Sequence, residues 1–228
     1  MSFEFRVLYD DNHCLAIAKP AGWLTMGDAT GDVTLLDAAK NYVKQKYAKP
    51  GAVFLGVVHR LDRPVSGVVL FARTSKAAAR LSEQFRTRTV EKVYWAVVAA
   101  TSIPGHGELR HTLRKDRARN VVEVEEDLPD DGCESVLHFR RFSQHDGLAW
   151  LEVRPVTGRS HQIRAQLSAA GWPIVGDRKY GSTIAFEPGS IALHAASLTF
   201  NHPTRHEPVT VTCPVPPSWQ RFVTLGLP

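Results

Sequence analysis

One carboxylate stands out as a candidate for chemistry: Asp62, which lies in a run of cationic side chains that includes His59, Arg60 and Arg63. Nearby positive charge favours the ionised form of a carboxyl group. An ionised carboxylate suits a nucleophile or an electrostatic stabiliser, whereas a general acid must carry a proton. The apolar run at 67–72 predicts a buried strand, so we expect Asp62 at its edge or in the preceding loop. An ordinary surface salt bridge is the alternative.

The stretch 59–67 reads H-R-L-D-R-P-V-S-G and resembles the catalytic motif of the RluA-type pseudouridine synthases, H-R-L-D-R-x-T-S-G followed by an apolar strand. Four further blocks resemble that family in the same order. They are the opening strand with its K-P-x-G turn at 10–22, the K-x-Y-x-A strand at 91–97, the T-G-R-x-H-Q-I-R block with its following glycines at 157–181, and the closing strands at 193–203. The resemblance extends over nearly the whole chain.

The resemblance implies an RNA pseudouridine synthase, an isomerase that converts uridine to pseudouridine. The reaction breaks the N1–C1′ bond, turns the base over and joins C5 to C1′. Nothing is oxidised and no group is imported, so we expect no cofactor and no metal ion. Positive charge develops at C1′ as the base leaves, and a carboxylate can stabilise it or form an adduct, as in glycoside hydrolysis. Asp62 is the acid that the motif supplies for this role.

The resemblance also implies roles for two residues outside this motif. The expected ion-pair partner of Asp62 is Arg164, from the I-R step of the block at 157–181, because a carboxylate in a cleft needs a counter-charge. Tyr94 matches the family's active-site tyrosine, whose ring can stack on uracil and whose hydroxyl can help to remove the C5 proton. The residues do not decide whether Asp62 attacks C1′, attacks the base or assists loss of a sugar proton.

A base inside a stacked helix is out of reach, so the target uridine must be flipped out. Arg60 resembles the arginine that the family inserts toward the vacated position, and we expect His59 and Arg63 to contact RNA beside it. Two positions depart from the common pattern. Val65 replaces a threonine and Gln166 replaces a frequent histidine, which leaves the fine specificity open.

The charge distribution favours a polyanionic partner. The net charge is +5, but residues 105–134 carry five Lys/Arg against nine Asp/Glu, so the rest of the chain is strongly basic. Such a surface suits phosphate contacts. The predicted helix from residue 75 bears basic residues that face either solvent or RNA: Lys76, Arg80, Arg86 and Arg88.

The spacing of the cysteines and the length of the apolar runs indicate the cellular compartment of the protein. Three widely spaced cysteines lack zinc or disulfide spacing, and no signal core or membrane-length apolar run is present. We therefore expect reduced thiols in a cytoplasmic protein. Three histidines lie close in sequence: His194, His202 and His206. We do not expect them to bind a metal ion, because histidines in hairpins and cores are commoner than metal-ligating histidines. We also expect a monomer, with no S4-like RNA-binding module before the opening strand.

The pattern of elements predicts an α+β fold in one catalytic domain, 1–228. Strands are expected at 14–18, 54–58, 67–72, 92–99, 135–142, 148–156, 192–200 and 208–215. Helices are expected at 35–47, from 75 and at 160–170, and a hairpin or mobile insertion at 104–134. The family resemblance specifies a mixed, largely antiparallel central β-sheet with flanking helices and loops.

Two other functions compete with the isomerase. One is an RNA-binding protein of the same fold that has lost catalysis, but such a protein is not expected to keep Asp62, Tyr94 and Arg164 together. The other is a nucleoside hydrolase or glycosylase that acts on a small ligand. The basic surface and the lack of a second, water-activating acid in the motif argue against it.

Overall fold

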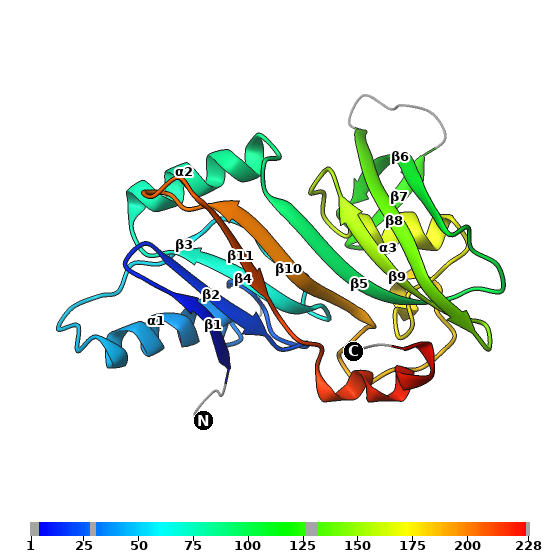
Figure 1. Ribbon diagram of the computed structural model, residues 1–228, viewed down its shortest axis with the longest axis horizontal. Helices are drawn as coiled ribbons and strands as arrows, with labels where there is room; N and C mark the ends of the chain where they lie inside the picture. The colour runs from blue at the N-terminus through cyan, green and yellow to red at the C-terminus, as the bar shows by residue number, and fades with distance from the viewer. Residues whose placement is uncertain (1–4, 28–30, 126–131, 227–228) are drawn as a thin grey trace. The chain divides into compact units, whose positions relative to one another are not determined.

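The computed structural model describes residues 5–27, 31–125 and 132–226 (Figure 1). The chain forms two compact units, and each is drawn from two segments. The first unit comprises Met1–Glu91 and Ala195–Pro214, and the second comprises Lys92–His194 and Val215–Pro228.

The first unit carries the strand order β1-β2-β4-β10, with β11 paired to β10 and β3 paired to β4. Helix α2 packs against β3 and β4. The elements are β1 (Arg6–Asp10), β2 (Cys14–Lys19), α1 (Leu35–Lys46), β3 (Gly56–Val57), β4 (Ser66–Ala72), α2 (Ser75–Arg86), β10 (Leu193–Asn201) and β11 (Pro208–Thr212).

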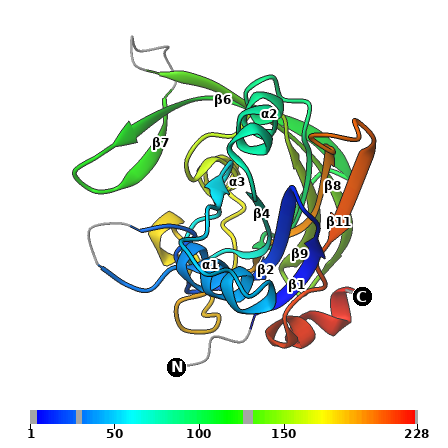
Figure 2. The ribbon, with the colours of Figure 1, turned by 90° about the vertical axis from the view of Figure 1, so that its left-hand side faces the viewer.

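The second unit carries the strand order β5-β9-β8-β6-β7, in which all four neighbouring pairs are antiparallel. Figure 2 shows the β6–β7 hairpin as a long two-stranded ribbon. The elements are β5 (Glu91–Ala99), β6 (His106–Asp116), β7 (Val121–Glu125), β8 (Cys133–His145), β9 (Leu148–Pro155), α3 (Gln162–Ala169) and the 3-10 helices η1 (Arg178–Tyr180) and η2 (Pro217–Leu225).

Local signals explain where the helices and hairpins begin. Thr34 and Asp37 form the capping box that starts α1, and the Thr74 hydroxyl accepts from the Ala77 N–H to start α2. The β8–β9 hairpin turns through Asp146 and Gly147, both with positive φ, as a two-residue hairpin turn requires. The predicted helix starts at 35 and 75 and the predicted strands at 135–142 and 148–156 are confirmed.

The core of the first unit places β4 directly after the Asp62 loop. One face of β2 and β4 packs with α2, β10 and β11 in a cluster that includes Leu70, Leu81 and Phe200. Gly67 has a φ of 122°, and a Cβ there would lie 2.3 Å from the Ala195 carbonyl oxygen. Only glycine allows β4 to begin this close to β10, which explains the glycine that ends the 59–67 motif.

Several expectations needed correction. Strand β3 spans two residues rather than 54–58, because it shares its edge of β4 with β10 and pairs only with Phe71 and Ala72. Strand β1 and helix η2 were not predicted. Helix α3 begins at Gln162, after His161 in a left-handed conformation, rather than at residue 160. The α+β class and the mixed, largely antiparallel β-structure are confirmed.

None of the helices within the described ranges combines the length and apolar character needed to cross a membrane. All three cysteines are free thiols, as expected.

Candidate active site

The backbone on the N-terminal side of Asp62 is fixed by the Thr25 hydroxyl. Thr25 Oγ1 donates to the Leu61 carbonyl at 3.0 Å and accepts from the Leu61 N–H at 3.2 Å. Both residues are buried. The loop between β3 and β4 lacks strand partners here, so this one side chain replaces a pair of ladder hydrogen bonds.

The backbone on the C-terminal side of Asp62 is fixed by the K-P-x-G turn. The Arg63 carbonyl accepts from the Gly22 N–H at 2.8 Å and from Lys19 Nζ at 3.1 Å. The Asp62 carbonyl accepts from the Val65 N–H at 3.0 Å, which closes the turn. The first two sequence blocks therefore meet, and together they hold the loop that presents Asp62.

Lys19 is an unusual residue because its ammonium group is buried at the end of β2. Its side chain is 1% exposed, and Nζ also donates to the carbonyls of Pro20 and Trp23. Burial lowers the pKa of Lys19 to about 7; the Asp62 charge opposes this change and the Arg63 charge adds to it. The site thus contains a lysine whose charge changes near neutral pH.

The three predicted RNA contacts beside Asp62 occupy different environments. His59 stacks on Phe85 at 4.7 Å between ring centroids, and its Nε2 accepts from the Leu70 N–H at 2.9 Å. Arg63 donates to the Gly22 carbonyl and pairs with Asp32. Arg60 is exposed. His59 and Arg63 therefore help to build the loop, while Arg60 presents its side chain to solvent.

In the second unit, the register of β5 assigns Tyr94 to one face of the sheet. Tyr94 pairs with Val153, which pairs with Phe139, so these side chains share a face. The Phe139 ring contacts Trp172, just after α3, at 5.2 Å between centroids. Tyr94 therefore lies on the face covered by the segment that follows α3.

Arg164 lies on α3 and is held by a buried carboxylate. Its Nε and Nη2 donate to Asp177 Oδ2 and Oδ1 at 2.7 and 2.8 Å, a bidentate pair. The guanidinium also lies over the Tyr180 ring, 4.9 Å from its centroid. The Tyr180 hydroxyl in turn contacts His161 Nδ1 and accepts from the Val122 N–H. These contacts fix the direction of Arg164, and its predicted pairing with Asp62 stays a prediction.

The other letters of the T-G-R-x-H-Q-I-R block build the turn before α3. Gln162 Oε1 accepts from the Thr157 hydroxyl and the Arg159 N–H, and its amide nitrogen donates to the Val136 carbonyl. Gln166, which replaces a common histidine, is fully buried and donates to the Leu109 and Ser135 carbonyls. Its contacts join α3 to β6 and β8.

A group with metal-ligand atoms lies at one end of the first unit: Asp11, Cys14 and His202, within 4.8 Å of one another. His202 Nδ1 accepts from the N–H groups of Thr204 and Arg205, so Nε2 carries the ring proton and donates to Asp11 at 2.7 Å. Burial, with the charge of Asp11, raises the pKa of the Cys14 thiol to about 12. The group is satisfied as a hydrogen-bonded cluster.

Sequence reasoning missed the residues that support the site: Lys19, Thr25, Asp177 and Tyr180. The family-like blocks include Lys19, Asp177 and Tyr180, but the blocks do not indicate which residues these side chains contact. Thr25 carried no signal, because a single threonine after a turn has no distinguishing pattern.

Comparison with known proteins now gives the family. A profile described as RNA pseudouridylate synthase matches residues 13–169. The chain belongs to this family, whose members isomerise uridine to pseudouridine in RNA. The chain is 38% identical over 96% of its length to a ribosomal large subunit pseudouridine synthase D of Xanthomonas campestris, and spans 68% of that protein.

Other pseudouridine synthases are also similar. A ribosomal large subunit pseudouridine synthase D of Xylella fastidiosa is 39% identical, with 92% of this chain and 66% of that protein covered. A tRNA pseudouridine synthase C of Pectobacterium carotovorum is 30% identical, with 96% and 61% covered. The chain thus spans about two thirds of the length of these relatives. The fold matches human RNA Pseudouridylate Synthase Domain Containing 4, with a TM-score of 0.78, 24% identity, and 95% and 92% of the two chains covered.

Proposed function

We propose that this pseudouridine synthase acts on one uridine of a structured RNA with Asp62, Tyr94 and Arg164 as its catalytic residues. The observation that best supports this proposal is the loop of Asp62. Hydrogen bonds from Thr25, Lys19, Gly22 and Val65 fix the backbone on both sides of one carboxylate. A catalytic group must be held closely to its productive geometry, and this loop meets that requirement.

In the proposed reaction, the ionised Asp62 carboxylate acts as the N1–C1′ bond breaks. The carboxylate either forms a covalent adduct, with the sugar or with the base, or assists loss of a sugar proton. The freed base turns over, a C5–C1′ bond forms, the C5 proton leaves to restore the C5–C6 double bond, and N1 gains a proton in exchange. No atom is gained or lost overall, so we propose that the reaction needs neither cofactor nor metal ion.

The proposed roles of the other residues follow from the chemistry of their side chains. We assign Tyr94 to stacking on the uracil and to removal of the C5 proton. We assign Arg164, oriented by Asp177, to charge compensation for Asp62. Arg60 and Arg63 are both exposed, but Arg63 pairs with Asp32 and donates to the Gly22 carbonyl. Arg60 is therefore the better suited to fill the space of the flipped base. RNA contacts by His59 and Arg63 stay predictions, since both side chains already make contacts within the first unit.

We propose ribosomal RNA of the large subunit as the substrate, with tRNA as the alternative. Two relatives that are 38% and 39% identical carry the large-subunit name, whereas the tRNA enzyme is 30% identical. We further propose that residues 1–228 act as one catalytic domain and as a monomer. A cytoplasmic location fits an RNA substrate and free cysteines.

The test is to incubate the protein with unmodified large-subunit rRNA and, separately, with a tRNA pool, and to map pseudouridine at single-nucleotide resolution. We expect one site in rRNA with wild type and none with Asp62→Asn. Conversion confined to tRNA would replace the substrate proposal. Conversion by Asp62→Asn at the wild-type rate would overturn the catalytic assignment.

A further inference from the structure

We propose that Thr25 is a positioning residue for Asp62, acting through the backbone of Leu61. This inference rests on the proposed function, because it takes Asp62 as the reacting carboxylate. Thr25 lies outside the family-like blocks. It is 3% exposed, and its one polar side-chain group is a hydroxyl.

The Thr25 hydroxyl binds both the carbonyl and the N–H of Leu61. A threonine hydroxyl has one donor hydrogen and two acceptor lone pairs. Thr25 uses the hydrogen for the Leu61 carbonyl at 3.0 Å and a lone pair for the Leu61 N–H at 3.2 Å. Leu61 is itself buried, so its backbone would otherwise lack a partner of this quality.

Holding the Leu61 carbonyl also fixes the start of Asp62. The peptide bond is planar, so the Leu61 carbonyl and the nitrogen and Cα of Asp62 lie in one rigid plane. The next plane, between Asp62 and Arg63, is held by the hydrogen bond from the Val65 N–H to the Asp62 carbonyl. The Cα of Asp62 therefore lies between two fixed peptide planes, and Thr25 controls the first.

Thr25 is in turn anchored to helix α1. Its carbonyl accepts from the Leu36 N–H at 3.1 Å, and the Leu24 carbonyl accepts from the Leu35 N–H at 2.9 Å. These bonds use N–H groups of the first turn of α1, which have no partner within a helix. The hydroxyl is thus held by a regular element, so it can position Leu61 rather than follow it.

Removing the hydroxyl should affect the chemical step more than RNA affinity. Phosphate contacts set most of the affinity for RNA, whereas the rate depends on the position of the carboxylate. A displacement of about 1 Å can lower a rate by about 100-fold. Thr25→Val keeps the shape but loses the hydroxyl, and Thr25→Ser keeps the hydroxyl but loses the methyl group.

The experiment measures single-turnover conversion and RNA dissociation constants for wild type, Thr25→Val, Thr25→Ser and a matched control, Thr74→Val. Thr74 also lies in the first unit, and its hydroxyl accepts from the Ala77 N–H at the start of α2. We expect Thr25→Val to lose about 10- to 100-fold in rate with affinity within about threefold of wild type. Thr25→Ser and Thr74→Val should keep rates within about threefold of wild type.

A wild-type rate in Thr25→Val, or equal rate losses in Thr25→Val and Thr74→Val, would overturn the proposal. So would an affinity loss as large as the rate loss.

Circular dichroism checks whether each variant folds. If Thr25→Val does not fold, Thr25→Cys, with its weaker hydrogen bonds, should give a rate between those of Thr25→Ser and Asp62→Asn; equality with wild type overturns the proposal. An active Asp62→Asn would instead refute the underlying function.

Discussion

Arg164 and Asp177 form a buried bidentate ion pair, with Nε–Oδ2 and Nη2–Oδ1 distances of 2.7 and 2.8 Å. The two side chains are 6% and 1% exposed. A guanidinium held by both oxygens of a carboxylate cannot rotate freely, so Asp177 sets the direction from which Arg164 can act. The arginine of the family block thus has a structural partner in addition to its proposed catalytic one.

Replacing Arg164 with Met should lower both stability and activity. The variant leaves Asp177 buried without its counter-charge, which costs about 3–5 kcal/mol for a fully buried pair. Urea unfolding measures the stability, and single-turnover conversion measures the rate. A normal rate in Arg164→Met would show that Asp62 is balanced by another cation, such as Arg60 or Arg63.

A double variant separates the two roles of Arg164. In Arg164→Met/Asp177→Leu both charges are gone, so we expect most of the lost stability to return. The rate should stay low if Arg164 compensates the charge of Asp62, because that guanidinium is absent from the double variant. If rate and stability return together, Arg164 has only a structural role.

Asp62→Asn should abolish isomerisation while RNA still binds. In the proposed mechanism the change removes the charge that stabilises C1′ but leaves the basic residues that we expect to contact phosphates. Filter binding and pseudouridine mapping on the same RNA give the two readouts. Asp62→Glu is the matched variant: it keeps the charge but moves it by one methylene group, so we expect a residual rate. An Asp62→Asn protein that loses affinity as strongly as activity would indicate a binding role instead.

Much of the site was predictable because its motif is local. His59 to Gly67 are contiguous, and the apolar run after them indicated the strand that anchors Asp62. The partners of these residues were not predictable from spacing. Asp177 follows Arg164 by 13 positions, and Thr25 precedes Leu61 by 36. Such contacts depend on how the chain returns on itself, which a single sequence does not reveal.

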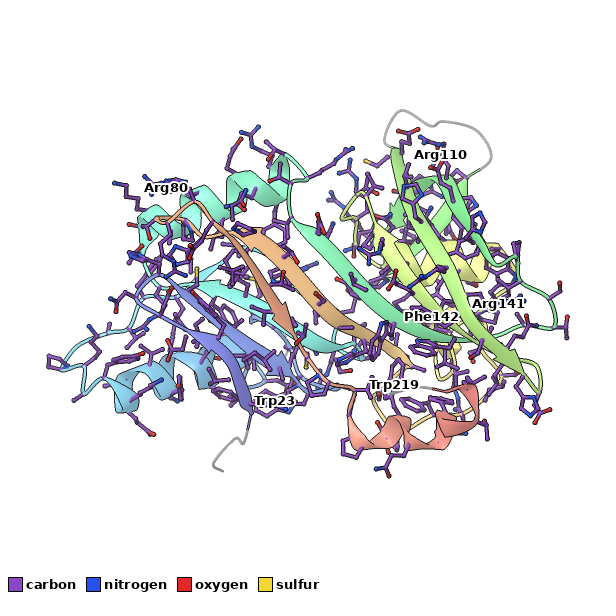
Figure 3. The ribbon with its side chains drawn as sticks, in the orientation of Figure 1. Trp23, Arg80, Arg110, Arg141, Phe142 and Trp219 are labelled. Carbon is purple, nitrogen blue, oxygen red and sulfur yellow. The ribbon has the colours of Figure 1, made fainter. Side chains whose placement is uncertain are left out.

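The pairing of charged residues was also not predictable from the sequence. The count of charges in the acid-rich segment 105–134 does not reveal how those charges are paired. In the described part, its five acids all pair with three arginines across or along the β6–β7 and β6–β8 strand pairs (Figure 3 labels Arg110). The paired acids are Glu108, Asp116, Glu123, Glu125 and Glu134. Strand register decides this pairing. Because like charges would oppose docking, we expect the acids of 123–134 to lie away from bound RNA. Residues 126–131 of this segment lie outside the described residues.

The salt dependence of RNA binding should identify whether α2 contacts RNA. Arg80 donates to the Pro203 carbonyl and is partly buried, so its replacement should reduce stability (Figure 3). Lys76 is exposed and is the better probe. Lys76→Ala should flatten the plot of log affinity against log salt by about 0.7–0.9 if its ammonium contacts a phosphate. Lys49→Ala, at another exposed lysine of the first unit, is the control; an unchanged slope in Lys76→Ala assigns α2 to solvent.

Activity should survive removal of metal ions. The Asp11, Cys14 and His202 cluster has a protonated Nε2 on His202 and a thiol whose pKa is raised to about 12, both unfavourable for a metal ligand. Dialysis against a chelator followed by activity and metal analysis tests this. Loss of activity that zinc restores in wild type but not in Cys14→Ser would contradict it. Magnesium that acts by folding the RNA would restore both proteins equally.

The buried Lys19 should make stability depend on pH near neutrality. Burial lowers its pKa from the ordinary 10.5 to about 7. Below pH 7 the lysine is charged in both folded and unfolded chains, and the full cost of burying the charge applies. Between pH 7 and 10.5 the folded chain releases a proton that the unfolded chain keeps, so the free energy of unfolding rises with pH.

Lys19→Met lacks this titration and isolates its contribution. We expect the stability of wild type relative to Lys19→Met to increase by about 1.4 kcal/mol per pH unit above the folded pKa, measured by urea unfolding from pH 6 to pH 9. Lys49→Met, which removes an exposed lysine, should follow the wild-type curve. In Asp62→Asn the rise should begin at lower pH, because the Asp62 charge favours the charged lysine. Parallel curves for wild type and Lys19→Met would show that the three carbonyl acceptors keep Lys19 charged throughout this range.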